Sequence, residues 1–205
     1  MNQTFVFSGH RNLILCILLC FLLFLSGCSY SSAPGKPAAE DGTVTVGHSL
    51  EVRNKDERLT LLDNKDALAA DGLYYAAWTA GNCEPYENKD GDTVDLYDAQ
   101  LYLLLGEAKS SEDAQHDMDT WLAAARENYE VQKEDTVSCG GNAYTLLTYN
   151  CKSADTPYDR GVSAFYTDQN TAVCIELTCR ADYAEDLYSM LTGFLNNCSY
   201  HTAQA

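Results

Sequence analysis

The residue types that could perform hydrolytic chemistry occur in this chain without a spacing that identifies a reaction. The four histidines, His10, His48, His116 and His201, are scattered along the sequence. Nucleophilic catalysis needs a Ser, Cys or Thr beside a histidine that an acid orients, and neither a Gly-x-Ser-x-Gly nor a His-Glu-x-x-His motif is present. We therefore expect no catalytic residue and no cofactor. A carboxylate pair hidden among the 30 acidic residues stays open as the alternative, because sequence spacing does not show which carboxylates meet.

Four oxygen-bearing side chains fall within eight residues, at Asn88, Asp90, Asp92 and Asp95. Such a density of oxygen ligands occurs in calcium loops. The EF-hand pattern requires Gly at its sixth position and Glu at its twelfth, whereas counting from Asn88 places a glycine fourth and an alanine twelfth. Asp-Gly favours tight turns, so we expect a solvated hairpin turn here and no metal ligand.

An uncharged apolar run at residues 13–25 ends in Leu25-Ser26-Gly27-Cys28. Its 13 residues are fewer than the roughly 20 that span a bilayer as a helix, and the pattern is typical of a cleaved secretory signal. The last four residues resemble the lipobox of bacterial lipoproteins. The resemblance implies cleavage before Cys28, acylation of Cys28, and anchoring to the extracytoplasmic face of the cell membrane.

The sequence therefore divides into three parts. We expect a lipoprotein signal peptide at residues 1–27, a lipidated cysteine with a flexible tether at 28–42, and a globular domain at 43–201. Residues 29–42 are Ser, Ala, Pro and Gly with almost no bulky apolar side chain, which is typical of a linker. A flexible chain of that length spans on the order of 20 Å.

The chain is strongly acidic. Residues 28–205 hold 12 Lys or Arg against 30 Asp or Glu, a formal charge of −18. Nucleic-acid binding needs clustered basic residues, so this charge excludes a nucleic-acid partner. It also disfavours contact between the domain body and an anionic lipid surface. Solubility of an exported domain explains the acidity, and binding of cations or of a basic partner is the alternative.

Six cysteines remain beyond the signal and Cys28. An even number in an exported chain predicts a disulfide framework, while the absence of any Cys-x-x-Cys disfavours zinc or thioredoxin chemistry. The candidates are Cys83, Cys139, Cys151, Cys174, Cys179 and Cys198. Extended strands would hold Cys174 away from Cys179, and Cys139 away from Cys151. We prefer a Cys151–Cys179 pair, with the other four sharing two bridges, among 15 connectivities.

The order of elements indicates an α+β fold, an antiparallel β-sheet packed against two amphipathic helices in a single domain. Strands are expected within 43–53, 58–62, 72–79, 93–105, 143–151, 161–166 and 171–179. A helix should begin after Ser110, with an apolar stripe of Ala114, Met118, Trp121, Leu122, Ala125 and Tyr129. A second should begin near Asp182, where Asp182-x-x-Glu185 resembles a capping box. Its stripe is Tyr183, Leu187, Met190, Leu191, Phe194, Leu195 and Cys198.

The meander of short strands after the first helix, closed by the second helix, resembles the PsbP-like fold, in an element order that covers roughly residues 43–200. That resemblance lies in element order and implies no functional residue. The tyrosines on the expected strands, with Trp78, are interpreted as sheet-packing residues, and an exposed aromatic face for a sugar or a partner is the alternative. The leading functional hypothesis is a non-catalytic, membrane-anchored module that binds a protein or an envelope component. The alternatives are a small envelope-polymer hydrolase and a solute-binding lipoprotein linked to transport.

Overall fold

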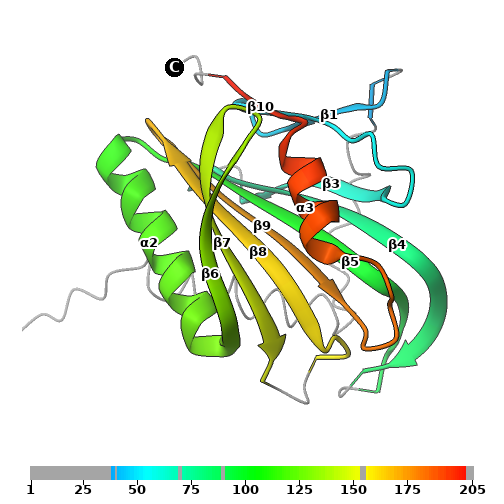
Figure 1. Ribbon diagram of the computed structural model, residues 1–205. Coiled ribbons are helices and arrows are strands. Elements are labelled where there is room, and N and C mark those ends of the chain that lie inside the picture. Colours follow the sequence, from blue (N-terminus) through cyan, green and yellow to red (C-terminus); the bar gives the residue numbers. More distant parts are fainter. Residues whose placement is uncertain (1–37, 40, 69–70, 89–90, 153–155, 202–205) are drawn as a thin grey trace, which may run out of the picture.

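The computed structural model describes residues 38–39, 41–68, 71–88, 91–152 and 156–201 (Figure 1). The apolar run at 13–25, Cys28 and most of the expected tether lie outside these residues. Within the described ranges, no helix is both long enough and apolar enough to cross a membrane.

A seven-stranded antiparallel sheet forms the centre of the fold (Figure 1). Its strands are, in spatial order, β3 (Thr60–Leu68), β4 (Leu73–Glu87), β5 (Thr93–Glu107), β9 (Thr171–Cys179), β8 (Arg160–Asp168), β7 (Asn142–Cys151) and β6 (Tyr129–Cys139). Strand β9, the last of this sheet along the chain, thus lies beside β5 and brings residues from both halves of the chain together at the centre of the sheet.

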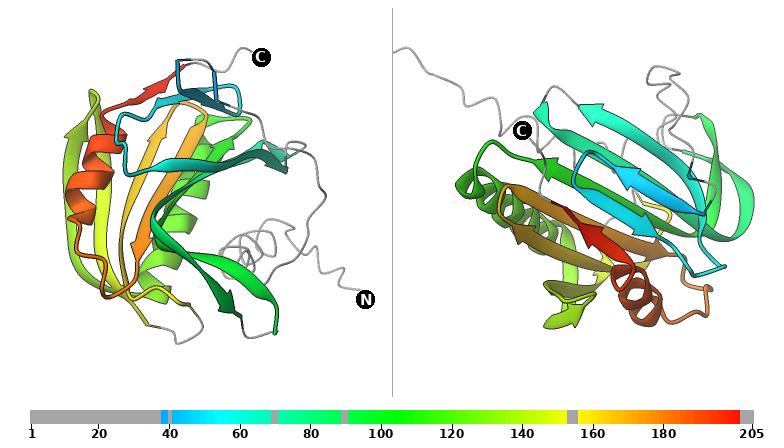
Figure 2. Two further views of the ribbon diagram at one scale, coloured as in Figure 1. Left: turned by 90° about the vertical axis from the view of Figure 1, so that its right-hand side faces the viewer. Right: turned by 90° about the horizontal axis from the view of Figure 1, so that it is seen from above.

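A second, three-stranded antiparallel sheet consists of β1 (Thr43–Val46), β2 (Leu50–Arg53) and β10 (Cys198–Tyr200), with β2 in the middle. It lies near one end of the large sheet, where Figure 2 shows the blue β1 and β2 beside the red β10. The small sheet therefore joins the two ends of the described chain.

Two helices cover opposite faces of the large sheet (Figures 1 and 2). Helix α2 (Ser111–Asn128) packs on one face with Leu147 and Tyr149, and helix α3 (Leu187–Leu195) packs on the other with Tyr144 and Leu146. Alternate residues of a strand point to opposite faces, so β7 contributes to both cores. We refer to these as the α2 core and the α3 core.

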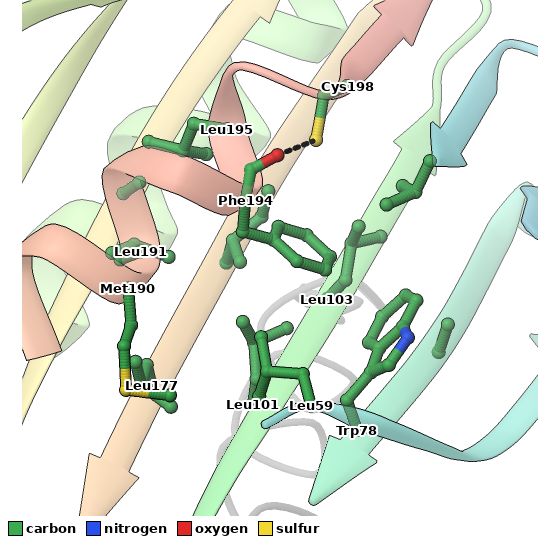
Figure 3. Packing of buried hydrophobic residues seen from close by; sticks show 14 of the residues in the cluster. Leu59, Trp78, Leu101, Leu103, Leu177, Met190, Leu191, Phe194, Leu195 and Cys198 are labelled. Carbon is green, nitrogen blue, oxygen red and sulfur yellow. Dashed lines mark hydrogen bonds between the residues drawn. The ribbon is translucent and has the colours of Figure 1, made fainter. Parts of the chain in front are cut away.

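The α3 core also contains the inward-facing residues of the small sheet. Figure 3 shows Leu191 and Phe194 of α3 above Leu101 and Leu103 of β5. The Phe194 ring meets Trp78 of β4 edge to face, with ring centroids 4.9 Å apart. This arrangement is favourable for aromatic pairs and fixes the position of α3 over the centre of the sheet.

These observations confirm the expected class, a mostly antiparallel sheet with two helices. The first helix begins as predicted, because the Ser110 hydroxyl accepts the backbone N–H of Asp113 at 3.1 Å. The start of the second helix was predicted wrongly. Its N-cap is Asp186, whose carboxylate accepts the backbone N–H groups of Tyr188 and Ser189, and Asp182 lies before the helix.

Three tertiary contacts hold residues 180–185 outside the helix. Arg160 donates to the carbonyl oxygen of Tyr183 at 2.6 Å, the backbone N–H of Ala181 donates to Asp159 at 2.8 Å, and Arg58 pairs with Glu185. These contacts override the local capping pattern at Asp182.

Two strands were missed. β6 follows α2 directly, with Tyr129 as both the C-cap of the helix and the first residue of the strand. β10 includes Cys198, which was expected at the end of the second helix. The segment 43–53 is also two strands, because residues 47–49 turn the chain between β1 and β2.

Candidate functional site

A buried carboxyl group, that of Glu176, lies in the middle of the large sheet on the face that α2 covers. Glu176 is 5 % exposed and occupies the centre of β9, opposite Tyr102 of β5 and Ser163 of β8. Ionisable side chains are rarely buried without partners. The polar groups around it therefore form the best-defined candidate site in the described structure.

Three hydroxyl groups donate hydrogen bonds to this carboxyl. Tyr149 and Tyr129 donate from their phenols, and Ser163 donates from its hydroxyl at 3.4 Å. The residues come from β7, β6 and β8, while Glu176 comes from β9. We call Glu176, Tyr149, Tyr129 and Ser163 the Glu176 cluster.

A glycine makes room for the cluster. Tyr149 is the cross-strand neighbour of Gly161, which lies on β8 between Tyr149 and β9. A Cβ atom on Gly161 would collide with the phenol of Tyr149. The absence of a side chain at this position lets the tyrosine lean across β8 and reach Glu176.

The end of α2 completes the cluster. Tyr129 follows the last helical residue, and its ring stacks on the ring of Tyr149 with centroids 4.0 Å apart and an interplanar angle of 8°. The helix is further located by Trp121, whose indole lies over Gly106 of β5, where a Cβ atom would approach it to 3.1 Å. The cluster therefore connects the helix terminus to three strands.

Burial raises the pKa of Glu176 above the usual carboxyl range, and the hydrogen bonds from the three hydroxyls lower it in part. Burial, followed by the nearby Glu176 carboxyl, raises the pKa of both Tyr129 and Tyr149. The same two causes raise the pKa of the Cys151 thiol to about 12. At neutral pH these phenols and this thiol are therefore protonated, and none of them is an activated nucleophile.

Among the described residues, the groups that contact the Glu176 carboxyl are hydroxyls. Across the ranges that the structure describes, no group of three or more His, Cys, Asp or Glu side chains could hold a metal ion. The geometry suits a hydrogen-bond network that ties α2 to the sheet. Sequence reasoning placed Glu176 on a strand but did not identify the cluster, because its four members come from four separate segments.

The described histidines lie in two places: His48 and His201 at the small sheet, where the backbone N–H of His201 donates to the carbonyl oxygen of Ser49 at 2.8 Å, and His116 on α2. His48 donates its backbone N–H to Glu107 at 2.6 Å, and His201 lies 3.5 Å from Glu51. His116 is exposed on α2, and His10 lies outside the described residues.

The Asn88–Asp95 segment forms the expected hairpin turn between β4 and β5. The backbone N–H of Asn88 donates to the carbonyl oxygen of Asp92 at 2.9 Å, and Gly91 has φ +86°. Asp90 lies outside the described residues.

Tyr74, Tyr75 and Trp78 of β4 pack inside the fold. Tyr74 and Trp78 are 5 % and 1 % exposed and belong to the α3 core. Tyr75 lies against the α2 core, and its hydroxyl donates to Asp63 at 3.0 Å. This placement agrees with the sheet-packing interpretation of these three side chains.

The six cysteines are unpaired in the described structure, and the geometry argues against the preferred Cys151–Cys179 pair. Cys151 faces the α2 core, whereas Cys179 faces the α3 core on the opposite side of the sheet. The backbone of Asp159 also lies between them, because Cys151 donates to Asp159 and Asp159 donates to Cys179. Cys139 and Cys198, in contrast, both face the α3 core. Cys28 lies outside the described residues.

Comparison with known proteins gives a distant structural likeness. No protein-family model matches the chain, and no curated protein matches it. Among solved structures, it is similar to the solution structure of cyanobacterial PsbP (CyanoP) from Synechocystis sp. PCC 6803. The two are 14% identical with a TM-score of 0.38, and the match covers 70% of this chain and 93% of that chain.

Proposed function

We propose that this protein is a lipid-anchored, extracytoplasmic lipoprotein whose domain binds a protein or cell-envelope partner without catalysing a reaction. The observation that carries the proposal is Leu25-Ser26-Gly27-Cys28 at the end of the apolar run. Several acyl chains on one cysteine hold a protein firmly on a membrane, at about 0.8 kcal/mol per buried methylene. The domain itself, being acidic, stays off an anionic surface.

The non-catalytic part of the proposal is supported by the Glu176 cluster. Its carboxyl is buried, has a raised pKa and is occupied by hydroxyl donors. A glycosidase needs two carboxyl groups about 5–9.5 Å apart on either side of a substrate. Glu176 instead faces phenols and a serine, so the cluster fits a structural role better than the hydrolase alternative.

The far half of the β4–β5 hairpin is the surface that we expect to contact a partner. Residues 81–85 and 87 are exposed on both faces of β4, which places this arm outside both cores. Contacts at its base keep it in position. Asp98 accepts the backbone N–H of Asn82 at 2.7 Å, and Arg180 pairs with Glu84. An arm held in position by such contacts loses less conformational freedom on binding than an unsupported loop.

Membrane anchoring is tested by Cys28→Ser in cells of the source organism. We expect the wild-type protein in the membrane fraction, labelled by a clickable fatty acid, and the variant released and unlabelled. Cys83→Ser is the matched control, because Cys83 is an exposed cysteine whose loss leaves the lipobox intact. Membrane retention of Cys28→Ser would overturn the anchoring proposal.

Partner binding is tested with a photo-crosslinking amino acid at Tyr86 on the arm. The same amino acid at Tyr188, which is 37% exposed on α3, is the control. We expect illumination of intact cells to give a discrete adduct from position 86 that mass spectrometry identifies as an envelope protein. If adducts formed only from position 188, the binding surface would lie on α3 instead of the arm. If neither position gave an adduct, the result would contradict partner binding.

A further inference from the structure

Two cysteines from distant parts of the chain lie together where α3 ends. Cys139 is the last residue of β6 and Cys198 is the first residue of β10. They are 5 % and 4 % exposed and belong to the same α3 core. Figure 3 shows the Cys198 sulfur near the carbonyl oxygen of Phe194, with an Sγ–O distance of 3.7 Å.

Backbone contacts bring the segments next to these two cysteines together. The N–H of Gly140, the residue after Cys139, donates to the side chain of Asn196 at 2.8 Å. A Cβ atom on Gly140 would lie 3.1 Å from the carbonyl oxygen of Leu195 and 3.6 Å from the Cα of Asn196. A disulfide needs Cα atoms within about 7 Å of each other, and these contacts bring the segments that carry Cys139 and Cys198 toward that separation.

The other four cysteines lie away from this pair. Cys179 also belongs to the α3 core, but it is level with Asn150 of β7 through Arg160, whereas Cys139 pairs with Asn142 at the other end of β7, about 26 Å away at 3.3 Å per residue. Cys83 lies on the exposed arm, opposite Tyr97. Cys151 and Cys174 share the α2 core, but Cys174 is level with Thr145 through Phe165. Cys151 lies farther along β7 than Thr145, about 20 Å away at 3.3 Å per residue. Cys151 and Cys174 are therefore too far apart to form a bridge.

We propose that Cys139 and Cys198 form a disulfide that fastens the C-terminal strand β10 to the end of the β6–β7 hairpin. The bridge would close by exchange with an external disulfide, such as an extracytoplasmic disulfide oxidoreductase or oxidised glutathione. The first cysteine thiolate attacks that disulfide and expels one thiolate, and the second cysteine thiolate then displaces the other. The external disulfide accepts two electrons and is reduced to two thiols. These thiols carry the two protons that the cysteines have lost.

The bridge must close while the chain folds. Burial, followed by the neighbouring Cys139, raises the pKa of the Cys198 thiol to about 12, and burial raises that of Cys139. In the folded domain both sulfurs are therefore protonated and poor nucleophiles at neutral pH. This proposal rests on the proposed function in one respect: export places the protein in an oxidising compartment, where disulfides form and persist.

The test is made on the protein as cells produce it. The wild-type protein is extracted from its cellular fraction with detergent, denatured in N-ethylmaleimide without reductant, digested and analysed by mass spectrometry. We expect one linked peptide pair that contains Cys139 and Cys198. Two results would contradict the pairing: alkylation of both cysteines, or a link from either one to another cysteine. The proposal is overturned when the same result is also obtained with the refolded protein described next.

A refolding experiment distinguishes failure of the disulfide proposal from failure of the export proposal. The purified full chain is unfolded, reduced and refolded in oxidised and reduced glutathione. A Cys139–Cys198 link here supports the pairing even if the cellular protein proves to be reduced and unlipidated, a result that would contradict export alone. Cys139→Ser should leave the Cys198 thiol alkylatable, whereas the control Cys174→Ser should leave the link intact.

Discussion

Titration of Glu176 should make the stability of the domain depend on pH in a way that one substitution removes. The folded-state pKa of Glu176 is raised by burial, whereas in the unfolded chain it should lie near 4.3. Between these two values the folded state keeps a proton that the unfolded state has lost, so the free energy of unfolding falls as the pH rises. One proton limits this slope to about 1.4 kcal/mol per pH unit, and the loss is complete above the folded-state pKa.

The measurement compares wild type with Glu176→Gln by urea unfolding at a series of pH values. Trp78 and Trp121 report on the α3 and α2 cores by fluorescence. The stability of the variant relative to wild type should rise with pH, by at most about 1.4 kcal/mol per unit. Glu57→Gln, the same change at an exposed position, is the control and should show no such trend. A difference that is constant with pH, or that has the opposite slope, would refute the reasoning.

Three further substitutions test the packing. Leu187→Ala removes a side chain that is 3 % exposed in the α3 core and should cost about 2–5 kcal/mol in urea unfolding, while a loss below about 0.5 kcal/mol would show that it is not a core residue. Asp186→Ala should cost about 1 kcal/mol as the N-cap of α3, and Asp182→Ala much less; equal losses would contradict the revised helix start. Gly161→Ala should cost about 1–3 kcal/mol by displacing the Tyr149 ring, measured by the same unfolding curves, and a neutral result would show that the ring has room to move.

The sequence predicted the helices and central strands well where local signals agreed with tertiary packing. Ser110, the acids after it and the stripe through Trp121 and Ala125 all indicated α2. At α3 the stripe was right from Leu187 to Leu195, whereas Tyr183 and Cys198 lie outside the helix. The start was predicted wrongly because Asp182 and Asp186 both resemble N-caps. The choice between them depends on contacts with Asp159, Arg160 and Arg58, which are distant in sequence.

Strand β6 and the Glu176 cluster were not predicted, for two physical reasons. β6 is an edge strand with mostly exposed polar residues, so its sequence lacks the apolar alternation that marks a half-buried strand. The cluster depends on register, because Tyr149 reaches Glu176 only where Gly161 lies between β7 and β9. A lone glutamate in an apolar run, Glu176 within Thr171–Cys179, is the one signal that could have indicated a buried carboxyl.

The most direct test of the central claim is the mass of the N-terminal peptide of the protein recovered from cells. We predict a peptide that begins at Cys28 and carries a diacylglyceryl thioether, with or without a third acyl chain on its amino group. An unmodified Cys28 within an uncleaved chain, or a bare amino terminus at another residue, would contradict the lipid anchor and the membrane location that depends on it.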